Sequence, residues 1–243
     1  MAVRRERLDL ILVRRGLAET RERAHALILS GAVRVDGLHA TRPAQPVTDH
    51  ALVEVQSAGP DYVSRGALKL EKALEVWAID PTEKVVLDVG ASTGGFTDLL
   101  LRRGARRVYA VDVGYGQLHY RLRNDPRVVS LERTNIRSLT DLPEKAQLGV
   151  VDVSFISLEL ALPPMFKLVG DEIVALVKPQ FEAGRAQVGK GGVVRDPAVH
   201  QHVIQRLQAW SETQTWRLMQ TVESPITGPA GNIEFLSHWL PAG

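Results

Sequence analysis

A glycine-rich segment directly after an apolar stretch is the first feature whose residue types could do chemistry. It reads LDVGASTGGF over residues 87–96, and Asp112 ends the next apolar stretch, 22 residues beyond Gly90. Glycines let the backbone approach a ligand, and an acid at the end of the next strand can accept hydrogen bonds from a ribose diol. A dinucleotide site would show G-x-G-x-x-G, whereas Ser92 stands here at the second glycine position. The spacing favours a nucleoside cofactor, with a plain tight turn as the alternative.

Two charged residues end apolar stretches farther along the chain. Asp152 interrupts VVDVSF, and Lys178 follows VALV. Ligands bind at the carboxyl ends of strands in open parallel sheets, and a charge buried there without a partner would be costly. Each residue alone could be a turn acid or a solvated strand end, but together they indicate a site. Glu234 would join them if its strand runs antiparallel to the others; otherwise it is an outward-facing acid.

A further group of charges lies on a helix expected over residues 64–78. Arg65, Lys69 and Lys72 share one face, opposite an apolar face. Such a basic face is most often simply solvated. The chain has no cysteine, its seven histidines are scattered, and it shows no nucleophile–histidine signature. We therefore expect no metal centre and no nucleophilic catalysis.

The elements that must position these residues fall into two groups. Residues 7–29 are typical of two short helices, Asp36-Gly37 indicates a hairpin, and residues 52–55 indicate a closing strand. From residue 64, nearly all-apolar strands alternate with helices, which predicts a parallel sheet covered on both faces. The expected strands are 85–89, 108–113, 128–131, 149–153, 173–177, 217–223 and 233–240, and the expected helices are 64–78, 97–103, 117–124, 158–168 and 197–211.

The fold class is therefore α/β, in two domains. A small α+β unit is expected at residues 1–57, a turn-rich linker at 58–63, and the sheet domain at 64–243. We find no secretory signal and no run of about 18 apolar residues that could span a membrane. These features predict a cytoplasmic protein without membrane contact.

The charge distribution suits an RNA partner better than the net charge of +2 suggests. Residues 4–34 carry eight arginines against four acids, and further arginines cluster at 102–107 and 121–127. Arginine binds phosphate with two parallel hydrogen bonds, so such basic faces fit RNA. Genomic composition or thermal adaptation would enrich arginine as well, and charge alone does not separate the two explanations.

The successive blocks of the chain resemble the hemolysin-A-like (TlyA) family of ribosomal RNA 2′-O-methyltransferases, over essentially the whole length. RLDLILVRRGLAETRERAHALILSGAVRVDG is similar to an S4 RNA-binding domain. Seven further segments resemble successive blocks of the family's methyltransferase half: VSRGALKLEKAL, LDVGASTGGFTDLLL, DVGYGQL, DVSFISL, VKPQFE, GKGGVVRD and SPITGPAGNIEFL. The resemblance implies a Rossmann-like seven-stranded methyltransferase sheet behind a small N-terminal S4 domain. Some relatives carry a tryptophan-rich interdomain segment, where this chain has SAGPDY.

The resemblance also implies roles for individual residues. A catalytic tetrad would consist of Lys69, Asp152, Lys178 and Glu234, which opposes the interpretation of Lys69 as a solvated charge. In this tetrad Lys178 would remove the proton of the 2′-hydroxyl, Lys69 would hold the hydroxyl or a phosphate, and the two acids would orient the lysines. S-adenosylmethionine would contact Gly90, Ser92, Thr93, Gly94, Gly95, Asp112, Asn135 and Ile136.

RNA recognition would rest on arginines of the first domain and of the helix that follows it. The expected RNA contacts are Arg4, Arg5, Arg7, Arg14, Arg15, Arg21, Arg23 and Arg65. The implied partner is rRNA or a ribosomal subunit, with a cytidine of the large-subunit rRNA, and in some relatives also one of the small subunit, as target. We expect the chain to act as a monomer.

Three other functions fit parts of the sequence. An RNA-binding or ribosome-assembly protein with an inactive methyltransferase domain is opposed by the complete tetrad. A pore-forming hemolysin, which the traditional family name suggests, would need an apolar inserting segment that the sequence does not show. An NAD-dependent oxidoreductase is disfavoured by the glycine spacing.

Overall fold

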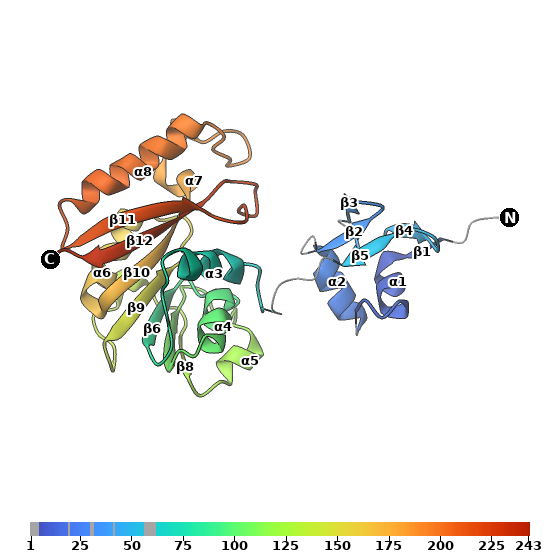
Figure 1. The fold of residues 1–243 in the computed structure, drawn as a ribbon, viewed down its shortest axis with the longest axis horizontal. Coiled ribbons are helices and arrows are strands. Elements are labelled where there is room, and N and C mark those ends of the chain that lie inside the picture. Colours follow the sequence, from blue (N-terminus) through green and yellow to red (C-terminus); the bar gives the residue numbers. More distant parts are fainter. Residues whose placement is uncertain (1–4, 19, 30–31, 41, 56–61) are drawn as a thin grey trace. The chain divides into compact units, whose positions relative to one another are not determined.

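The computed structural model describes residues 5–18, 20–29, 32–40, 42–55 and 62–243. The chain divides into two compact units, residues 1–61 and 62–243 (Figure 1). Arg4 and most of the linker expected at 58–63 lie outside the described residues.

The N-terminal unit packs two helices against short strands. The helices are α1 (Leu8–Arg14) and α2 (Arg21–Leu29), and the strands are β1 (Arg5–Arg7), β2 (Val33–Val35), β3 (Leu38–His39), β4 (Pro46–Thr48) and β5 (Val53–Val55). Asp36 and Gly37 join β2 to β3 with φ of 50° and 81°, the left-handed pair that a two-residue hairpin turn of type I′ requires. The predicted hairpin is confirmed. The pairing of β1 with β4 was not predicted, because neither three-residue segment shows a strand pattern.

Seven strands form the sheet of the C-terminal unit, in the order β11-β12-β10-β9-β6-β7-β8. They are β6 (Val85–Val89), β7 (Arg107–Val111), β8 (Val128–Leu131), β9 (Ala146–Val151), β10 (Val169–Val177), β11 (Trp216–Glu223) and β12 (Phe235–Pro241). The predicted parallel pairing holds from β10 through β8, whereas β12 runs antiparallel to β10 and β11. This reversal brings the start of β12 to the edge where the parallel strands end.

Helices cover both faces of this sheet and bury two separate cores. One face carries α3 (Ala67–Val76), α4 (Gly95–Arg102) and α5 (Tyr120–Arg123), and the other carries α6 (Leu158–Leu168) and α8 (Pro197–Ser211). Alternation along β6 explains the division: Val86 packs toward α3 and α4, while Leu87 packs toward α6. In Figure 1, α8 lies along β11, and the short helix α7 (Pro179–Glu182) follows β10.

Several element boundaries differ from those predicted. The helix expected from residue 64 begins at Ala67, because tight turns precede it, in which the amides of Ala67 and Leu68 bond to carbonyls three residues back. Strands β7 and β9 end before Asp112 and Asp152, so both acids stand directly after their strands. The helix expected at 117–124 is reduced to α5.

Candidate active site

The glycine segment leaves the carboxyl end of β6 and turns into α4. Gly90 and Gly94 have φ of 83° and 99°, a backbone conformation that L side chains rarely adopt. A Cβ atom at Gly90 would also overlap the backbone carbonyl of Asp152. Glycine is therefore required where this loop passes the end of β9.

Asp112 anchors the same loop from the next strand. Its carboxylate accepts hydrogen bonds from the backbone amides of Ser92, at 2.8 Å, and Gly114, at 2.7 Å. An ionised carboxylate offers about four acceptor positions, so about two remain for other donors such as ribose hydroxyls. Asp112 can thus hold the loop and bind a ligand at once.

A cavity of about 710 Å³ lies at this edge of the sheet. Small-molecule sites in proteins measure roughly 300–1,000 Å³, so the cavity is large enough for a nucleoside cofactor. Of the expected cofactor contacts, the structure places five in its wall: Gly90, Ser92, Asp112, Asn135 and Ile136. The other three, Thr93, Gly94 and Gly95, are not among the lining residues, and the two glycines face α5 and residues 64–67 instead.

Asp88 lies in β6, directly before the glycine loop, and was missed by the sequence analysis. It is fully buried, and its Oδ2 accepts a hydrogen bond of 2.6 Å from the Thr97 hydroxyl. Burial, together with the nearby carboxylates of Asp152 and Asp112, raises the pKa of Asp88 to about 7. An acid inside an otherwise apolar strand was the signal that could have identified it.

The four residues of the expected tetrad come together as two ion pairs. Lys69 Nζ lies 2.6 Å from Glu234 Oε2, and both side chains are buried. Lys178 Nζ lies 2.5 Å from Asp152 Oδ1. The residue before Lys178 pairs in register with the residue after Glu234, so the two ion pairs are neighbours across β10 and β12.

The burial of Lys69 corrects the interpretation drawn from helical periodicity. Arg65 and Lys72 are exposed, as expected for a solvated basic face, but Lys69 is only 6% exposed. A buried ammonium requires a partner, and Glu234 supplies it from a segment 165 residues away. The helix pattern contains no sign of that partner.

The residues after β9 form another wall of the cavity. Ser154 accepts a hydrogen bond of 3.0 Å from Lys178 Nζ. Phe155 is 90% exposed, has a left-handed φ of 64°, and its ring centroid lies 4.8 Å from that of Phe181. Left-handed backbone is uncommon in residues other than glycine, and exposed aromatic faces are where nucleic-acid bases stack. The sequence analysis missed all three residues, although an aromatic between a strand end and a helix cap was visible.

In the N-terminal unit, Asp9 organises part of the expected RNA-binding surface. It is fully buried and accepts hydrogen bonds from Arg7, Arg21 and His25. The Arg7 guanidinium above all, with His25 and Arg21, holds the pKa of Asp9 well below its usual range. Arg7 and Arg21 are thus held in place by Asp9, while their side chains remain partly exposed.

The other expected RNA contacts differ in their surroundings. Arg14 pairs with Glu6 and Asp49, and Arg15 donates to two backbone carbonyls. Arg5 and Arg65 are exposed, whereas the side chain of Arg23 lies outside the described part of the chain.

Within the described ranges, no group of three or more His, Cys, Asp or Glu side chains could hold a metal ion. Among the same residues, no helix is long and apolar enough to cross a membrane.

Comparison with known proteins identifies both units. Residues 62–239 match the FtsJ-like methyltransferase family, and residues 6–53 match the S4 domain. The chain belongs to the FtsJ-like methyltransferase family. The resemblance drawn from the sequence, the α/β methyltransferase fold and the N-terminal S4 domain are confirmed.

Relatives of this FtsJ-like methyltransferase carry two kinds of name. The 16S/23S rRNA (cytidine-2′-O)-methyltransferase TlyA of Mycobacterium tuberculosis is 50% identical, over 98% of this chain and 90% of its own. Hemolysin A of Brachyspira hyodysenteriae is 41% identical, over 96% of this chain and 99% of its own. A solved structure from Streptococcus thermophilus that bears a hemolysin name has a TM-score of 0.77 and 42% identity, covering 99% of this chain and 90% of that one.

Proposed function

We propose that this FtsJ-like methyltransferase transfers a methyl group from S-adenosylmethionine to the ribose 2′-hydroxyl of a cytidine in rRNA. The observation that carries the proposal is the pairing of Lys178 with Asp152 beside the cavity that Gly90 and Asp112 line. The activity for which the Mycobacterium relative is named supports the nucleotide and the position on the ribose. The S4 domain supports an RNA partner.

The chain's own residues fit S-adenosylmethionine in this cavity. Asp112 would accept hydrogen bonds from the ribose hydroxyls of the cofactor, and the loop at Gly90 and Ser92 would lie against its amino-acid portion. Asn135 and Ile136 would flank the adenine. When bound, the cofactor supplies a methyl group made electrophilic by its sulfonium.

Lys178 is the residue suited to remove the proton of the 2′-hydroxyl. Asp152 and Ser154 hold its Nζ atom, and in its neutral form the amine accepts the proton as the oxygen becomes nucleophilic. General-base assistance contributes roughly 10²–10⁴-fold to a rate. Correct placement of the reacting groups can remove about 7–11 kcal/mol of a barrier, so positioning is the larger contribution.

Lys69 would supply positive charge for the hydroxyl or a neighbouring phosphate. Its ion pair with Glu234 fixes the ammonium group at the edge where the strands end. Phe155 would offer an exposed aromatic face to a base of the RNA at the mouth of the cavity.

Single-turnover methylation of an rRNA fragment tests the role of Lys178. Lys178→Ala should slow methyl transfer by roughly 10²-fold or more, with little change in RNA and cofactor affinity. Lys178→Arg should not rescue the rate, because a guanidinium stays protonated and cannot accept the proton. Lys167→Ala, which removes an exposed lysine at the end of α6, is the matched control.

The outcomes separate a catalyst from an RNA-binding protein. Full activity of Lys178→Ala would remove Lys178 from the mechanism, and full activity of Lys178→Arg would leave it an electrostatic role only. Failure of the wild-type chain to methylate any rRNA would favour RNA binding without catalysis. Mapping 2′-O-methyl groups on rRNA from cells with and without the protein identifies the nucleotide.

A further inference from the structure

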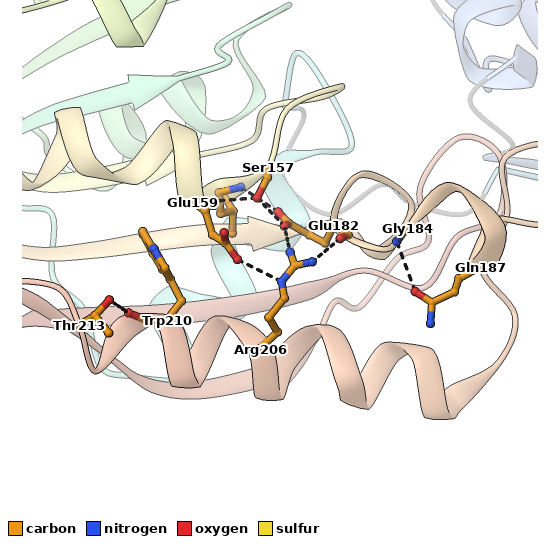
Figure 2. A network of polar contacts seen from close by, with 9 residues as sticks. Ser157, Glu159, Glu182, Gly184, Gln187, Arg206, Trp210 and Thr213 are labelled. Carbon is orange, nitrogen blue, oxygen red and sulfur yellow. Dashed lines mark hydrogen bonds and ion pairs between the residues drawn. The ribbon is translucent and has the colours of Figure 1, made fainter.

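Glu182, a buried carboxylate outside the tetrad, connects the two segments that carry Asp152 and Lys178. It ends α7 and is 5% exposed. Its Oε1 accepts the backbone amide of Leu158 at 2.8 Å, and its Oε2 accepts the Ser157 hydroxyl at 2.8 Å (Figure 2). Four residues after Lys178, the chain is therefore bonded to the segment that follows Asp152.

Arg206 fastens this connection to helix α8. Its Nη2 donates to Glu182 Oε2 at 2.9 Å, and its Nη1 donates to the Glu182 carbonyl at 2.8 Å. The Nε atom lies 3.0 Å from Glu159 Oε1, at the start of α6. Figure 2 shows the guanidinium reaching from α8 to both neighbouring segments. One side chain thus joins α6, α7 and α8.

The segment held in this way, residues 153–157, forms one wall of the cavity. Residues 153–157 all line it, and Phe155 adopts a left-handed backbone that costs free energy. Such a conformation persists only where the surrounding structure fixes it. On one side of Phe155, Ser154 bonds to Lys178; on the other side, Ser157 bonds to Glu182. Residues 178–182 therefore fix the loop at both ends.

We propose that Glu182 is a positioning residue for methyl transfer, which with Arg206 holds the 153–157 loop and the Lys178–Asp152 pair in their reactive arrangement. The proposal rests on the proposed function, because it assigns Lys178 to the reaction. A purely structural carboxylate would change the stability of the fold alone. A positioning residue also changes the rate of the folded, fully bound enzyme.

The test uses the full chain and compares Glu182→Gln with Glu172→Gln. Glutamine keeps the size of the side chain but removes the charge that holds Arg206. At saturating RNA and S-adenosylmethionine, the single-turnover rate of Glu182→Gln should fall roughly 10–100-fold, because a small misplacement of reacting groups has an effect of this size. Glu172 lies in the first half of β10, away from the strand end that carries Lys178, and its carboxylate pairs with Lys84 and His238. Glu172→Gln should therefore lower the stability of the fold and leave the rate unchanged.

A second pair of variants covers the case in which Glu182→Gln does not fold. Arg206 is partly exposed, and Arg206→Gln should slow the saturated rate as Glu182→Gln does. Arg217→Gln is its control, since Arg217 contacts Glu212 and carbonyls near the end of α8 and none of the loop residues.

The results distinguish this inference from the proposed function. Wild-type rates in the folded Glu182→Gln or Arg206→Gln variants would overturn it, and so would equal rate losses in the two controls. An inactive wild-type chain would instead overturn the proposed function, whereas full activity of Lys178→Ala would remove Lys178 from the mechanism and leave methyl transfer intact.

Discussion

Replacing the buried acid Asp88 with asparagine should change how the stability of the C-terminal unit depends on pH. Burial raises the pKa of Asp88 from 3.8 to about 7 in the folded chain. Between these pH values the folded state holds a proton that the unfolded state has lost. The bound proton therefore stabilises the folded wild type at about pH 4, and this stabilisation is lost as pH rises to about 7 and stays absent above that.

The size of the effect follows from the shift. The pKa difference is roughly 3 units, and each unit corresponds to about 1.4 kcal/mol, so Asp88 accounts for about 4 kcal/mol across this range. Asparagine does not titrate. Whatever the substitution does at pH 4, the unfolding free energy of Asp88→Asn minus that of the wild type should rise by about 4 kcal/mol between pH 4 and pH 8.

Urea unfolding followed by tryptophan fluorescence measures this difference in the intact chain. All four tryptophans, at positions 77, 210, 216 and 239, lie in the C-terminal unit, so the signal does not report on the S4 domain. Asp80→Asn is the control: hydrogen bonds from Thr82 lower the pKa of that exposed acid below 3.8, so its contribution to stability changes only below about pH 4. The difference between Asp80→Asn and wild type should therefore stay nearly constant between pH 4 and pH 8. The same difference between Asp88→Asn and wild type at both pH values would refute the reasoning.

Three further predictions concern ligands. Asp112→Ala should weaken S-adenosylmethionine binding by about 1.5–3 kcal/mol in calorimetry, through the loss of charge-assisted hydrogen bonds, and unchanged binding would contradict its role. Deleting residues 1–57 should weaken RNA binding but not cofactor binding, and wild-type RNA affinity should fall with salt; salt-independent affinity would argue against phosphate contacts. Phe155→Ala should weaken RNA binding by about 1–3 kcal/mol in fluorescence titrations if a base stacks on it, and an unchanged affinity would exclude stacking.

The sequence predicted the layered sheet well because its signals are local. Most strands of the parallel part are apolar runs followed by a helix pattern, so order and type could be assigned without knowing any distant partner. Asp152 and Lys178 interrupt or end such runs, which marks them within a few residues of sequence. The exact ends of strands and helices differed because tight turns and loop hydrogen bonds, as before α3, decide them.

The sequence did not predict the contacts that connect distant segments. Lys69 is separated from Glu234 by 165 residues, and Glu182 from Ser157 and Arg206 by 25 and 24. No local pattern encodes such pairs, because they form only when strand order and direction are set. Resemblance to a family identified Lys69, but it singled out neither Glu182 nor Arg206.

The different burial of the two ion pairs supports the division of roles between the lysines. Lys69 and Glu234 are 8% and 1% exposed in their side chains, whereas Lys178 and Asp152 are 11% and 22% exposed, and Asp152 lines the cavity. Removing the charge from one member of a buried ion pair leaves the other charge uncompensated, which costs about 3–5 kcal/mol of stability. Proton exchange is therefore cheaper at the more exposed pair. This difference fits the proposed roles, in which Lys178 takes the proton of the hydroxyl and Lys69 supplies a fixed positive charge.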